Sequence, residues 1–356
     1  MEKQYRSEYK LLLDANEMNF DPSNLTIDWS KIKAFNRYPD PDSLALKEVI
    51  CQELNRKESR YDSDNRYRPV SPEQLIIGTG SDEILKLILE GLTEKGSVAI
   101  APDPSFSEYE KLTQLVQGKL VKVPCNNFKV DVEALIDAQK RNDARLIFIA
   151  NPNNPTGQLI SKKEIEALLI NTDAWIVVDE AYAEFSQETA LGLLEKYEKL
   201  LITRTLSKAY GLAALRIGYL IASERVTASL SPYKMTYNIT GVSELIALQV
   251  LNDTDYSDQY IADVKALRRK AFDLLKEVNG LTLYPSEANF ILVEVNTKEN
   301  YSLLEKALEK NAIKVRYFKN SSNLNQDEPL HRCIRLTLTT FDEFEVLLSV
   351  IKEVMM

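Results

Sequence analysis

The sequence predicts an α/β protein in which a mostly parallel sheet, flanked by helices, forms a large domain beside a smaller α+β domain. Three observations predict this class. Apolar strand-like runs alternate with amphipathic helical segments from about residue 75 to 222, long charged helices and short strands follow beyond residue 242, and 44% of the 356 residues are hydrophobic. Alternation of strand and helix is typical of parallel sheets covered on both faces. A chain of this length forms about two domains.

Seven apolar runs in the first region have the length of buried strands and are expected to be strands. They lie at 75–78, 97–102, 119–124, 145–150, 174–180, 199–205 and 216–223. Amphipathic segments at 81–92, 105–116 and 161–170 separate some of these runs and are expected to be helices. Because ligands of such sheets bind at the carboxyl ends of the strands, we expect the functional site at that edge.

The second region predicts the smaller domain. Its expected helices are 243–252 and 260–278, its expected strands are 288–295, 313–318 and 331–338, and a helix follows as the last element. The predicted organisation is an N-terminal arm with part of the small domain at 1–35, a large domain at 36–250 and a C-terminal small domain at 251–356. The polar segments 55–74 and 319–330, which contain Pro, are expected to be surface loops.

Composition excludes several classes of protein. With a single histidine, His331, the chain cannot build a site of two or three imidazole ligands. A net charge of −9 disfavours nucleic-acid binding. No apolar run approaches the length of a membrane span, and the charged start does not resemble a signal peptide. Three distant cysteines without a CxxC pair suit a reducing compartment, so we expect a cytoplasmic protein.

Four segments with polar side chains follow predicted strands, where the ligand of such a sheet binds. They are Asn151–Gly157, Asp179–Tyr182, Arg204–Lys208 and Tyr210–Arg216. Together they bring a lysine, a carboxylate, a phenol, an amide and an arginine to one crevice. An earlier segment, Gly78–Glu83, opens a helix, whose unpaired backbone N–H groups and positive dipole end suit a phosphate.

These groups match what pyridoxal 5′-phosphate (PLP) requires: an amine for a Schiff base, a carboxylate for the pyridine nitrogen, donors for the phenolic oxygen and cations for the phosphate. The motifs that contain them are NPNNPTG, DEAY, TLSKAYGLAALR, PDPSF and GSDE. In this combination the chain resembles the fold-type I PLP aminotransferases, and most closely the histidinol-phosphate aminotransferase group. The resemblance extends from Asp14 to Thr337. It implies a fold-type I PLP transferase with PLP as cofactor.

The resemblance implies three catalytic residues. Lys208 is the Schiff-base lysine and the base that moves the α-proton of the substrate. Asp179 pairs with the pyridine nitrogen. Tyr182 reaches the phenolic oxygen of the cofactor together with Asn154.

The remaining cofactor contacts are also implied by the resemblance. Phe106 stacks on the pyridine ring, and Tyr38 reaches the phosphate of the neighbouring subunit's cofactor, which implies a homodimer. The phosphate is held by the side chains of Arg216, Thr205 and Ser207 and by the backbone of Ser81 and Asp82.

Three residues are implied to bind substrate. Arg335 corresponds to the arginine that clamps the α-carboxylate, a bidentate geometry that lysine cannot reproduce. Arg316 corresponds to an arginine that helps to bind the distal phosphate of histidinol phosphate. Asn16 is expected at the mouth of the site.

The predicted reaction converts L-histidinol phosphate and 2-oxoglutarate to imidazole acetol phosphate and L-glutamate in histidine biosynthesis. Three alternatives are an aminotransferase for aromatic or other amino acids, a threonine-phosphate decarboxylase and a non-enzymatic PLP-fold module of a regulator. Some features depart from the family pattern: 13 residues precede Asp14, Thr339-Thr340 replace the usual Gly-Thr, and the loop 56–72 is longer.

Overall fold

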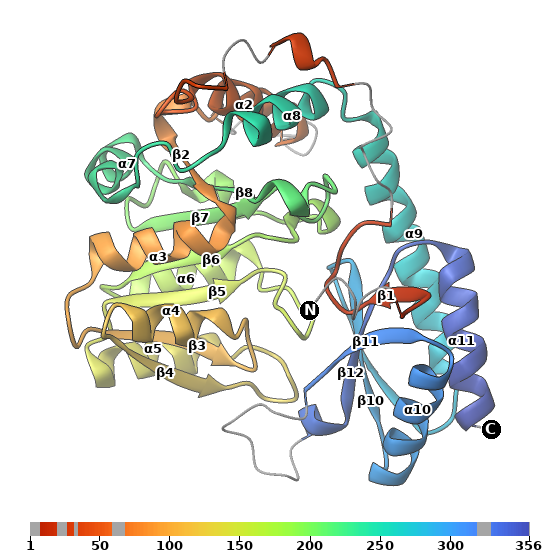
Figure 1. Cartoon of the computed structure of the whole chain (residues 1–356). Coiled ribbons are helices and arrows are strands. Elements are labelled where there is room, and N and C mark those ends of the chain that lie inside the picture. Colours follow the sequence, from red (N-terminus) through yellow and green to blue (C-terminus); the bar gives the residue numbers. More distant parts are fainter. Residues whose placement is uncertain (1–7, 20–26, 32–34, 59–67, 319–328, 356) are drawn as a thin grey trace.

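The computed structural model describes residues 8–19, 27–31, 35–58, 68–318 and 329–355. Two β-sheets lie side by side, each with its own set of helices (Figure 1). The larger sheet has seven strands and the smaller has five. The expected α/β class, with a large mostly parallel sheet and a smaller α+β part, is therefore confirmed.

The large sheet contains all seven strands that the apolar runs predict. Its order is β2-β8-β7-β6-β5-β3-β4, and β8 runs antiparallel to both of its neighbours while the other pairs are parallel. The strands are β2 (Leu75–Thr79), β3 (Val98–Asp103), β4 (Lys119–Pro124), β5 (Leu146–Ala150), β6 (Trp175–Asp179), β7 (Leu200–Thr205) and β8 (Ile217–Ile221).

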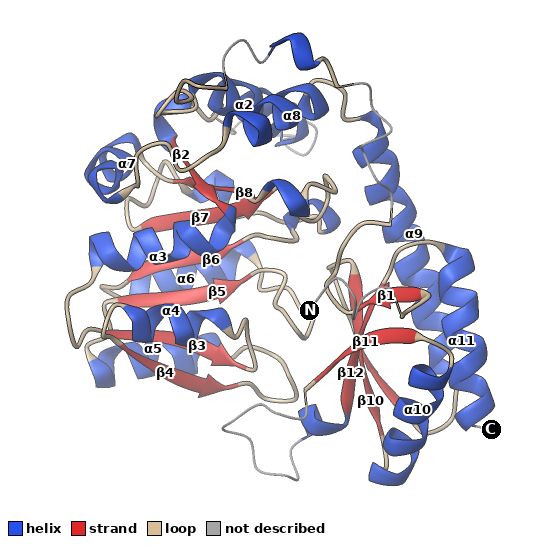
Figure 2. Ribbon diagram, in the orientation of Figure 1, coloured by secondary structure: helices blue, strands red, loops and turns tan. Residues whose placement is uncertain are grey.

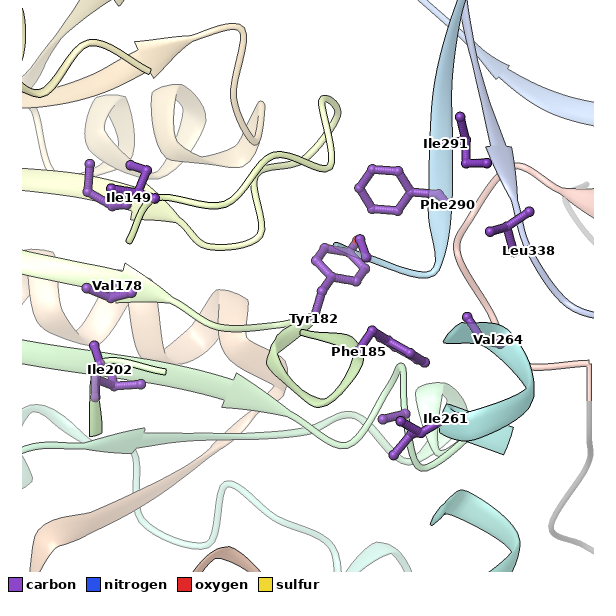
Figure 3. Close-up of a cluster of buried hydrophobic side chains, with 14 of the residues drawn as sticks. Ile149, Val178, Tyr182, Phe185, Ile202, Ile261, Val264, Phe290, Ile291 and Leu338 are labelled. Carbon is purple, nitrogen blue, oxygen red and sulfur yellow. The ribbon is translucent and has the colours of Figure 1, made fainter. Parts of the chain in front are cut away.

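Both faces of this sheet are buried, which explains why its strands are continuous apolar runs. In β5, Ile147 and Ile149 pack into the core on one face, and Phe148 packs into the core on the other. Ile149 lies beside Val178 and Val178 beside Ile202 on adjacent strands (Figure 3). Helices α3 (Gly80–Leu92), α4 (Glu108–Leu115) and α7 (Glu224–Leu230) contribute to the Phe148 side, and α5 (Val132–Asn142) and α6 (Lys162–Asn171) to the opposite side.

The small sheet combines the two ends of the described chain. Its order is β1-β11-β12-β10-β9, so the N-terminal strand β1 pairs in parallel with a strand 300 residues later in the sequence. Its strands are β1 (Leu11–Leu13), β9 (Leu281–Tyr284), β10 (Phe290–Val295), β11 (Ile313–Tyr317) and β12 (Cys333–Thr337). Helices α10 (Lys298–Lys310) and α11 (Phe341–Met355) lie beside this sheet (Figure 2). The last of them, α11, is the expected final helix.

The long helix α9 (Asp255–Lys276) runs down to the small sheet, where it contacts β9 and β10 (Figure 1). It follows α8 (Gly241–Leu251), which packs on α2 (Leu44–Glu58). None of the helices in the described ranges is long and apolar enough to span a membrane. The proposed domain boundaries at residues 35 and 250 stay predictions.

One expectation for the loops is wrong. Residues 55–58 belong to α2 rather than to a surface loop, and Pro72–Gln74 form a short 3-10 helix. The last turn of α2 is stabilised by ion pairs of Arg56 and Lys57 with Glu53 in the same helix and Asp258 in α9. The partner from α9 is distant in sequence, so local polarity could not reveal it. The central part of this segment and residues 319–328 lie outside the described residues.

Candidate active site

A cavity of about 870 Å³ opens at the carboxyl ends of the parallel strands, between the two sheets. It lies where the ligand of such a sheet is expected. Two predicted site residues, Asn16 and Tyr38, are not part of its lining. The other predicted residues line it together: Ser81, Asp82, Phe106, Asn154, Asp179, Tyr182, Thr205, Ser207, Lys208, Arg216, Arg316 and Arg335.

Lys208 enters the cavity from the turn that follows β7. Its Nζ donates a hydrogen bond to the Ala15 carbonyl at 2.8 Å and lies 5.9 Å from the centre of the Tyr182 ring. Tyr182 packs edge-on against Phe290 of the small sheet, with ring centres 5.2 Å apart (Figure 3). The lysine therefore lies where both sheets and the N-terminal segment meet.

Asp179 ends β6 and is only 4% exposed. Its Oδ2 accepts a hydrogen bond from the Tyr109 hydroxyl at 2.9 Å, and its Oδ1 accepts one from the Thr203 hydroxyl at 3.1 Å. Burial raises the pKa of this carboxyl to about 6, while the two hydroxyl donors act in the opposite direction. Within the described ranges no ammonium or guanidinium forms an ion pair with it. The site thus contains a buried carboxylate that lacks a cation.

The opposite end of the cavity suits an anion. Helix α3 begins there, and the first N–H groups of a helix have no partner within the helix. A Cβ on Gly218 would lie 2.3 Å from the Ser81 nitrogen, and one on Gly80, whose φ is +76°, would lie 2.5 Å from Arg216 Nη2. Glycines thus let β8, the start of α3 and an arginine approach closely.

Hydroxyl groups complete this end. Thr205 donates a hydrogen bond to the Ser207 hydroxyl at 3.0 Å, and both residues are buried. Arg216 is half-exposed and lies 3.3 Å from an Asp82 carboxylate oxygen. An exposed pair of this kind contributes little to stability. Its guanidinium can therefore exchange this partner for a bound anion at low cost.

Two arginines from the small sheet form the far wall. Arg335 on β12 is nearly buried and donates to Asn154 Oδ1 and to the Asp14 carbonyl, each at 2.6 Å. Arg316 is directly opposite Arg335 in the antiparallel register of β11 and β12. Burial lowers the pKa of the Arg335 guanidinium, and the positive charge of Arg316 lowers it further. Two adjacent cations at one wall favour an anionic ligand.

The N-terminal segment joins the two sheets, and its residues Asp14 and Ala15 line the cavity. Asn16, expected at the mouth, is instead buried; its Nδ2 donates to the Tyr182 hydroxyl at 3.0 Å, and its backbone N–H donates to Thr337 Oγ1 at 3.1 Å. Asn289 Nδ2 donates to the Asn16 carbonyl at 3.1 Å. The backbone of Asn16 has a φ of +54°, in the left-handed region that asparagine tolerates better than most residues.

Tyr38 lies away from this cavity. Its side chain is 80% exposed and stacks on Tyr237, with ring centres 4.5 Å apart. Phe35, Tyr233 and Met235 are further exposed apolar side chains of the same two segments. Within one chain, Tyr38 therefore does not contribute to the site.

Tyr109 and Thr203, the two hydroxyl donors to Asp179, were not among the predicted site residues. Tyr109 follows Phe106 by three residues, which places both near the start of α4. Thr203 is the register partner of Asp179 on the adjacent strand. The spacing of Tyr109 from Phe106 can be read from the sequence, but its contact with Asp179, 70 residues away, cannot. The position of Thr203 required the order of the strands.

The residues of the cavity fit PLP. A protonated pyridine nitrogen would supply the cation that Asp179 lacks, and the glycine-lined start of α3 with Arg216 suits a phosphate. Lys208 lines the same cavity as these groups and supplies the amine. Charge, burial and donor set thus agree with the chemistry of this cofactor.

Comparisons with known proteins agree with this geometry. The family model for class I and II aminotransferases matches residues 8–351. The histidinol-phosphate aminotransferase of Ruminiclostridium cellulolyticum is 35% identical over 352 residues, which cover 96% of this chain and 91% of that protein. The corresponding enzyme of Caldanaerobacter subterraneus is 32% identical, with 98% and 93% covered.

Solved structures show the same fold. The histidinol-phosphate aminotransferase of Sinorhizobium meliloti, in complex with pyridoxal 5′-phosphate, superimposes with a TM-score of 0.84 at 25% identity and covers 99% of this chain and 93% of that one. The L-threonine-O-3-phosphate decarboxylase of Porphyromonas gingivalis has a TM-score of 0.75 at 20% identity, covering 96% and 98%. The chain belongs to the class I and II aminotransferase family, the PLP-dependent enzymes that its motifs resemble.

Proposed function

We propose that this aminotransferase transfers the amino group of L-histidinol phosphate to 2-oxoglutarate. The observation that carries the proposal is the pairing of Arg316 with Arg335 on adjacent strands at one wall of the cavity, across from Lys208. The names of the relatives that are 32–35% identical over nearly the whole chain support the same substrate.

The two arginines suit the different anions of the two half-reactions. Histidinol phosphate carries a phosphate and no carboxylate, whereas 2-oxoglutarate carries two carboxylates. A guanidinium binds either group through two parallel hydrogen bonds. Arg335 is buried and donates to two oxygens of the protein, so we assign it to the α-carboxylate of the oxo acid. The more exposed Arg316 is assigned to the distal phosphate.

In the proposed mechanism, Lys208 provides both the amine that binds the cofactor and the base of the proton transfer. When bound, PLP supplies an electron-withdrawing ring that stabilises negative charge at the substrate Cα. The Lys208 Nζ would accept the proton from the Cα of the amino donor, and would donate a proton to the Cα of the new amino acid in the second half-reaction. Its hydrogen bond to the Ala15 carbonyl holds the amine in the cavity.

Other side chains orient the cofactor in this proposal. The Asp179 carboxylate keeps the ring nitrogen protonated, and Phe106 covers a face of the ring. Tyr182 and Asn154 donate to the phenolic oxygen. The phosphate would be held by side chains and backbone groups at the start of α3, at the end of β7 and just before β8: Ser81, Asp82, Thr205, Ser207 and Arg216.

We further propose a cytoplasmic homodimer in which Tyr38 reaches the partner's cofactor phosphate. Its exposure and its stacking on Tyr237 at 4.5 Å support a role across an interface, because an exposed aromatic pair gains stability when it is covered. The cysteines of the described ranges are free, in keeping with a reducing compartment.

The substrate is tested by assaying the purified enzyme with 2-oxoglutarate and a panel of amino donors. We expect kcat/KM to be highest for L-histidinol phosphate. A higher value for an aromatic amino acid would replace the proposal with an aromatic aminotransferase. Carbon dioxide release from threonine phosphate would indicate the decarboxylase activity instead.

Arg316→Met tests the role of the second arginine. Removing a guanidinium–phosphate contact should lower kcat/KM for histidinol phosphate by roughly 30-fold, equivalent to about 2 kcal/mol, and should spare a donor without a distal anionic group, such as alanine. Comparable losses on both donors would show that Arg316 acts structurally and not on the phosphate.

A further inference from the structure

The hydroxyl of Tyr109 contacts Asp179 from outside the cavity lining and has no role in the mechanism above. Tyr109 lies on α4, is fully buried and donates a hydrogen bond to Asp179 Oδ2 at 2.9 Å. Its ring stacks on Phe148 with centres 4.5 Å apart and planes 5° from parallel. Phe106 packs edge-on against it at 5.5 Å. Because two rings confine it, the hydroxyl is held in one direction.

Thr203 fixes the other oxygen of the same carboxylate. It is fully buried on β7, directly opposite Asp179 in the parallel register of β6 and β7, and donates to Oδ1 at 3.1 Å. Each carboxylate oxygen thus accepts one hydroxyl hydrogen bond, one from a helix and one from the neighbouring strand. Two contacts of this kind determine the rotation of the carboxylate as well as its position.

We propose that Tyr109 is a positioning residue whose hydroxyl, together with that of Thr203, holds the Asp179 carboxylate in a fixed orientation and in its ionised form. The inference rests on the role of Asp179 given under the proposed function, and goes beyond it by naming the groups that prepare this carboxylate. Neither residue lines the cavity, so both act through Asp179.

Electrostatics give the direction of the effect. Burial favours the neutral carboxylic acid, and a hydrogen bond donated to the carboxylate favours the ion. Asp82 from α3 also acts on Asp179 and raises its pKa, whereas the hydroxyls of Tyr109 and Thr203 lower it, as does a hydrogen bond from the backbone of Ala181. The pKa of Tyr109 itself is raised well above its usual value by burial and by Asp179, so the phenol remains a neutral donor. Without this hydroxyl, a larger fraction of Asp179 keeps its proton near neutral pH.

The phenol also links the carboxylate to the expected ring-stacking residue. Phe106 lines the cavity and Tyr109 lies behind it, in edge-on contact. A single short segment, Phe106 to Tyr109, thus presents an aromatic face to the cavity and a hydroxyl to Asp179. Phenylalanine at position 109 would keep the ring that packs against Phe106 and remove only the hydroxyl that contacts Asp179. This substitution therefore separates the two contributions.

The test compares Tyr109→Phe with Tyr284→Phe. Both remove a buried tyrosine hydroxyl from a carboxylate, since the Tyr284 hydroxyl donates to Glu294 Oε2 at 2.7 Å in the small sheet, and neither residue of this pair lines the cavity. Thr203→Val and Thr203→Ser form a second pair, in which serine keeps the hydroxyl. The measurements are the affinity of each apoprotein for PLP as a function of pH, kcat and KM of the loaded enzyme, and thermal stability.

We expect Tyr109→Phe to weaken PLP binding by about tenfold at neutral pH, the usual effect of one hydrogen bond to a charged group. The midpoint of the pH dependence of PLP binding should move to higher pH, and kcat should fall more than KM changes. Thr203→Val should act in the same direction and Thr203→Ser should restore binding. Tyr284→Phe should change neither the PLP affinity nor its pH midpoint.

The outcomes separate this inference from the proposed function. An unchanged PLP affinity and pH midpoint in Tyr109→Phe, with a large loss in Asp179→Asn, would overturn the inference and leave the role of Asp179 intact. Equal losses in Tyr109→Phe and Tyr284→Phe would also overturn it, because they would reflect packing alone. An Asp179→Asn enzyme with unchanged PLP binding and rate would instead contradict the proposed function.

Discussion

Lys208 is the residue whose removal tests the proposed chemistry most directly. We expect Lys208→Ala to lose transamination while the apoprotein still binds PLP noncovalently, because the anion-binding groups at the start of α3 remain. Activity and the PLP dissociation constant are measured on the same preparation. Lys199→Ala is the control, since Lys199 precedes the same strand at its opposite end and is half-exposed. Full activity in Lys208→Ala would contradict the mechanism.

Asp179 should reduce the stability of the apoprotein in a pH-dependent way. Its pKa is about 6 in the folded protein and close to 3.8 in the unfolded chain. Below pH 3.8 both states hold the proton, so the residue has no effect on stability. As the pH rises from about 4 to 6, the unfolded state releases its proton first and the folded state loses relative stability.

Asp179→Asn removes this titration. We expect the variant to raise the free energy of unfolding of the apoprotein by up to about 3 kcal/mol above pH 6, with the gain vanishing towards pH 4. The measurement is urea unfolding at several pH values. In the loaded enzyme the same variant should lower kcat by orders of magnitude. A gain that does not depend on pH would mean that Asp179 is already ionised in the folded apoprotein at pH 4.

The positions of some of these site residues could be predicted from the sequence. Lys208 and Asp179 were expected in the cavity and lie there, because each follows a strand whose end is readable from its apolar run. Tyr109 was not expected to matter, since its partner Asp179 is 70 residues away in sequence. Asn16 was expected at the mouth of the cavity but lies buried, because the preceding strand β1 pairs with β11 of the small sheet.

At the scale of elements, the segment after β1 connects the two sheets through Asn16. Asn16→Ala should destabilise the protein more than Asn16→Gly does. Both lose the hydrogen bond to Tyr182, but alanine must also adopt a left-handed φ, which costs roughly 1 kcal/mol, whereas glycine adopts it freely. Urea midpoints and the KM for 2-oxoglutarate are measured for both variants. Equal midpoints would show that the backbone conformation at residue 16 carries no strain.

The strands of the large sheet were predictable because burial on both faces produces continuous apolar runs, as in β5. Helix α2 was not assigned, although its apolar residues Leu46, Ile50 and Leu54 pack into the core. Its last turn depends on the ion pairs of Arg56 and Lys57 with α9. Strand β1 has only three residues and is stabilised as a strand by its pairing with β11. Strand β1 and the last turn of α2 thus depend on partners that are distant in the sequence.

At the scale of the whole molecule, the exposed Tyr38 predicts an assembly. We expect light scattering to give the mass of a dimer at assay concentrations, because the proposed site is incomplete without a partner. Tyr38→Ala should weaken PLP binding in the dimer, since it removes a contact to the phosphate. A stable and fully active monomer would show that Tyr38 does not serve a neighbouring site.

A mixing experiment decides whether Tyr38 acts across the interface. Tyr38→Ala and Lys208→Ala proteins are unfolded together, refolded and assayed at limiting PLP. If each site combines its own Lys208 with the partner's Tyr38, every mixed dimer contains one intact site and one site with both substitutions. With random pairing, half of the dimers are mixed, so about one quarter of the native sites return. If Tyr38 serves its own chain, no mixed dimer contains an intact site, and the activity of the mixture stays at the average of the two variants refolded separately.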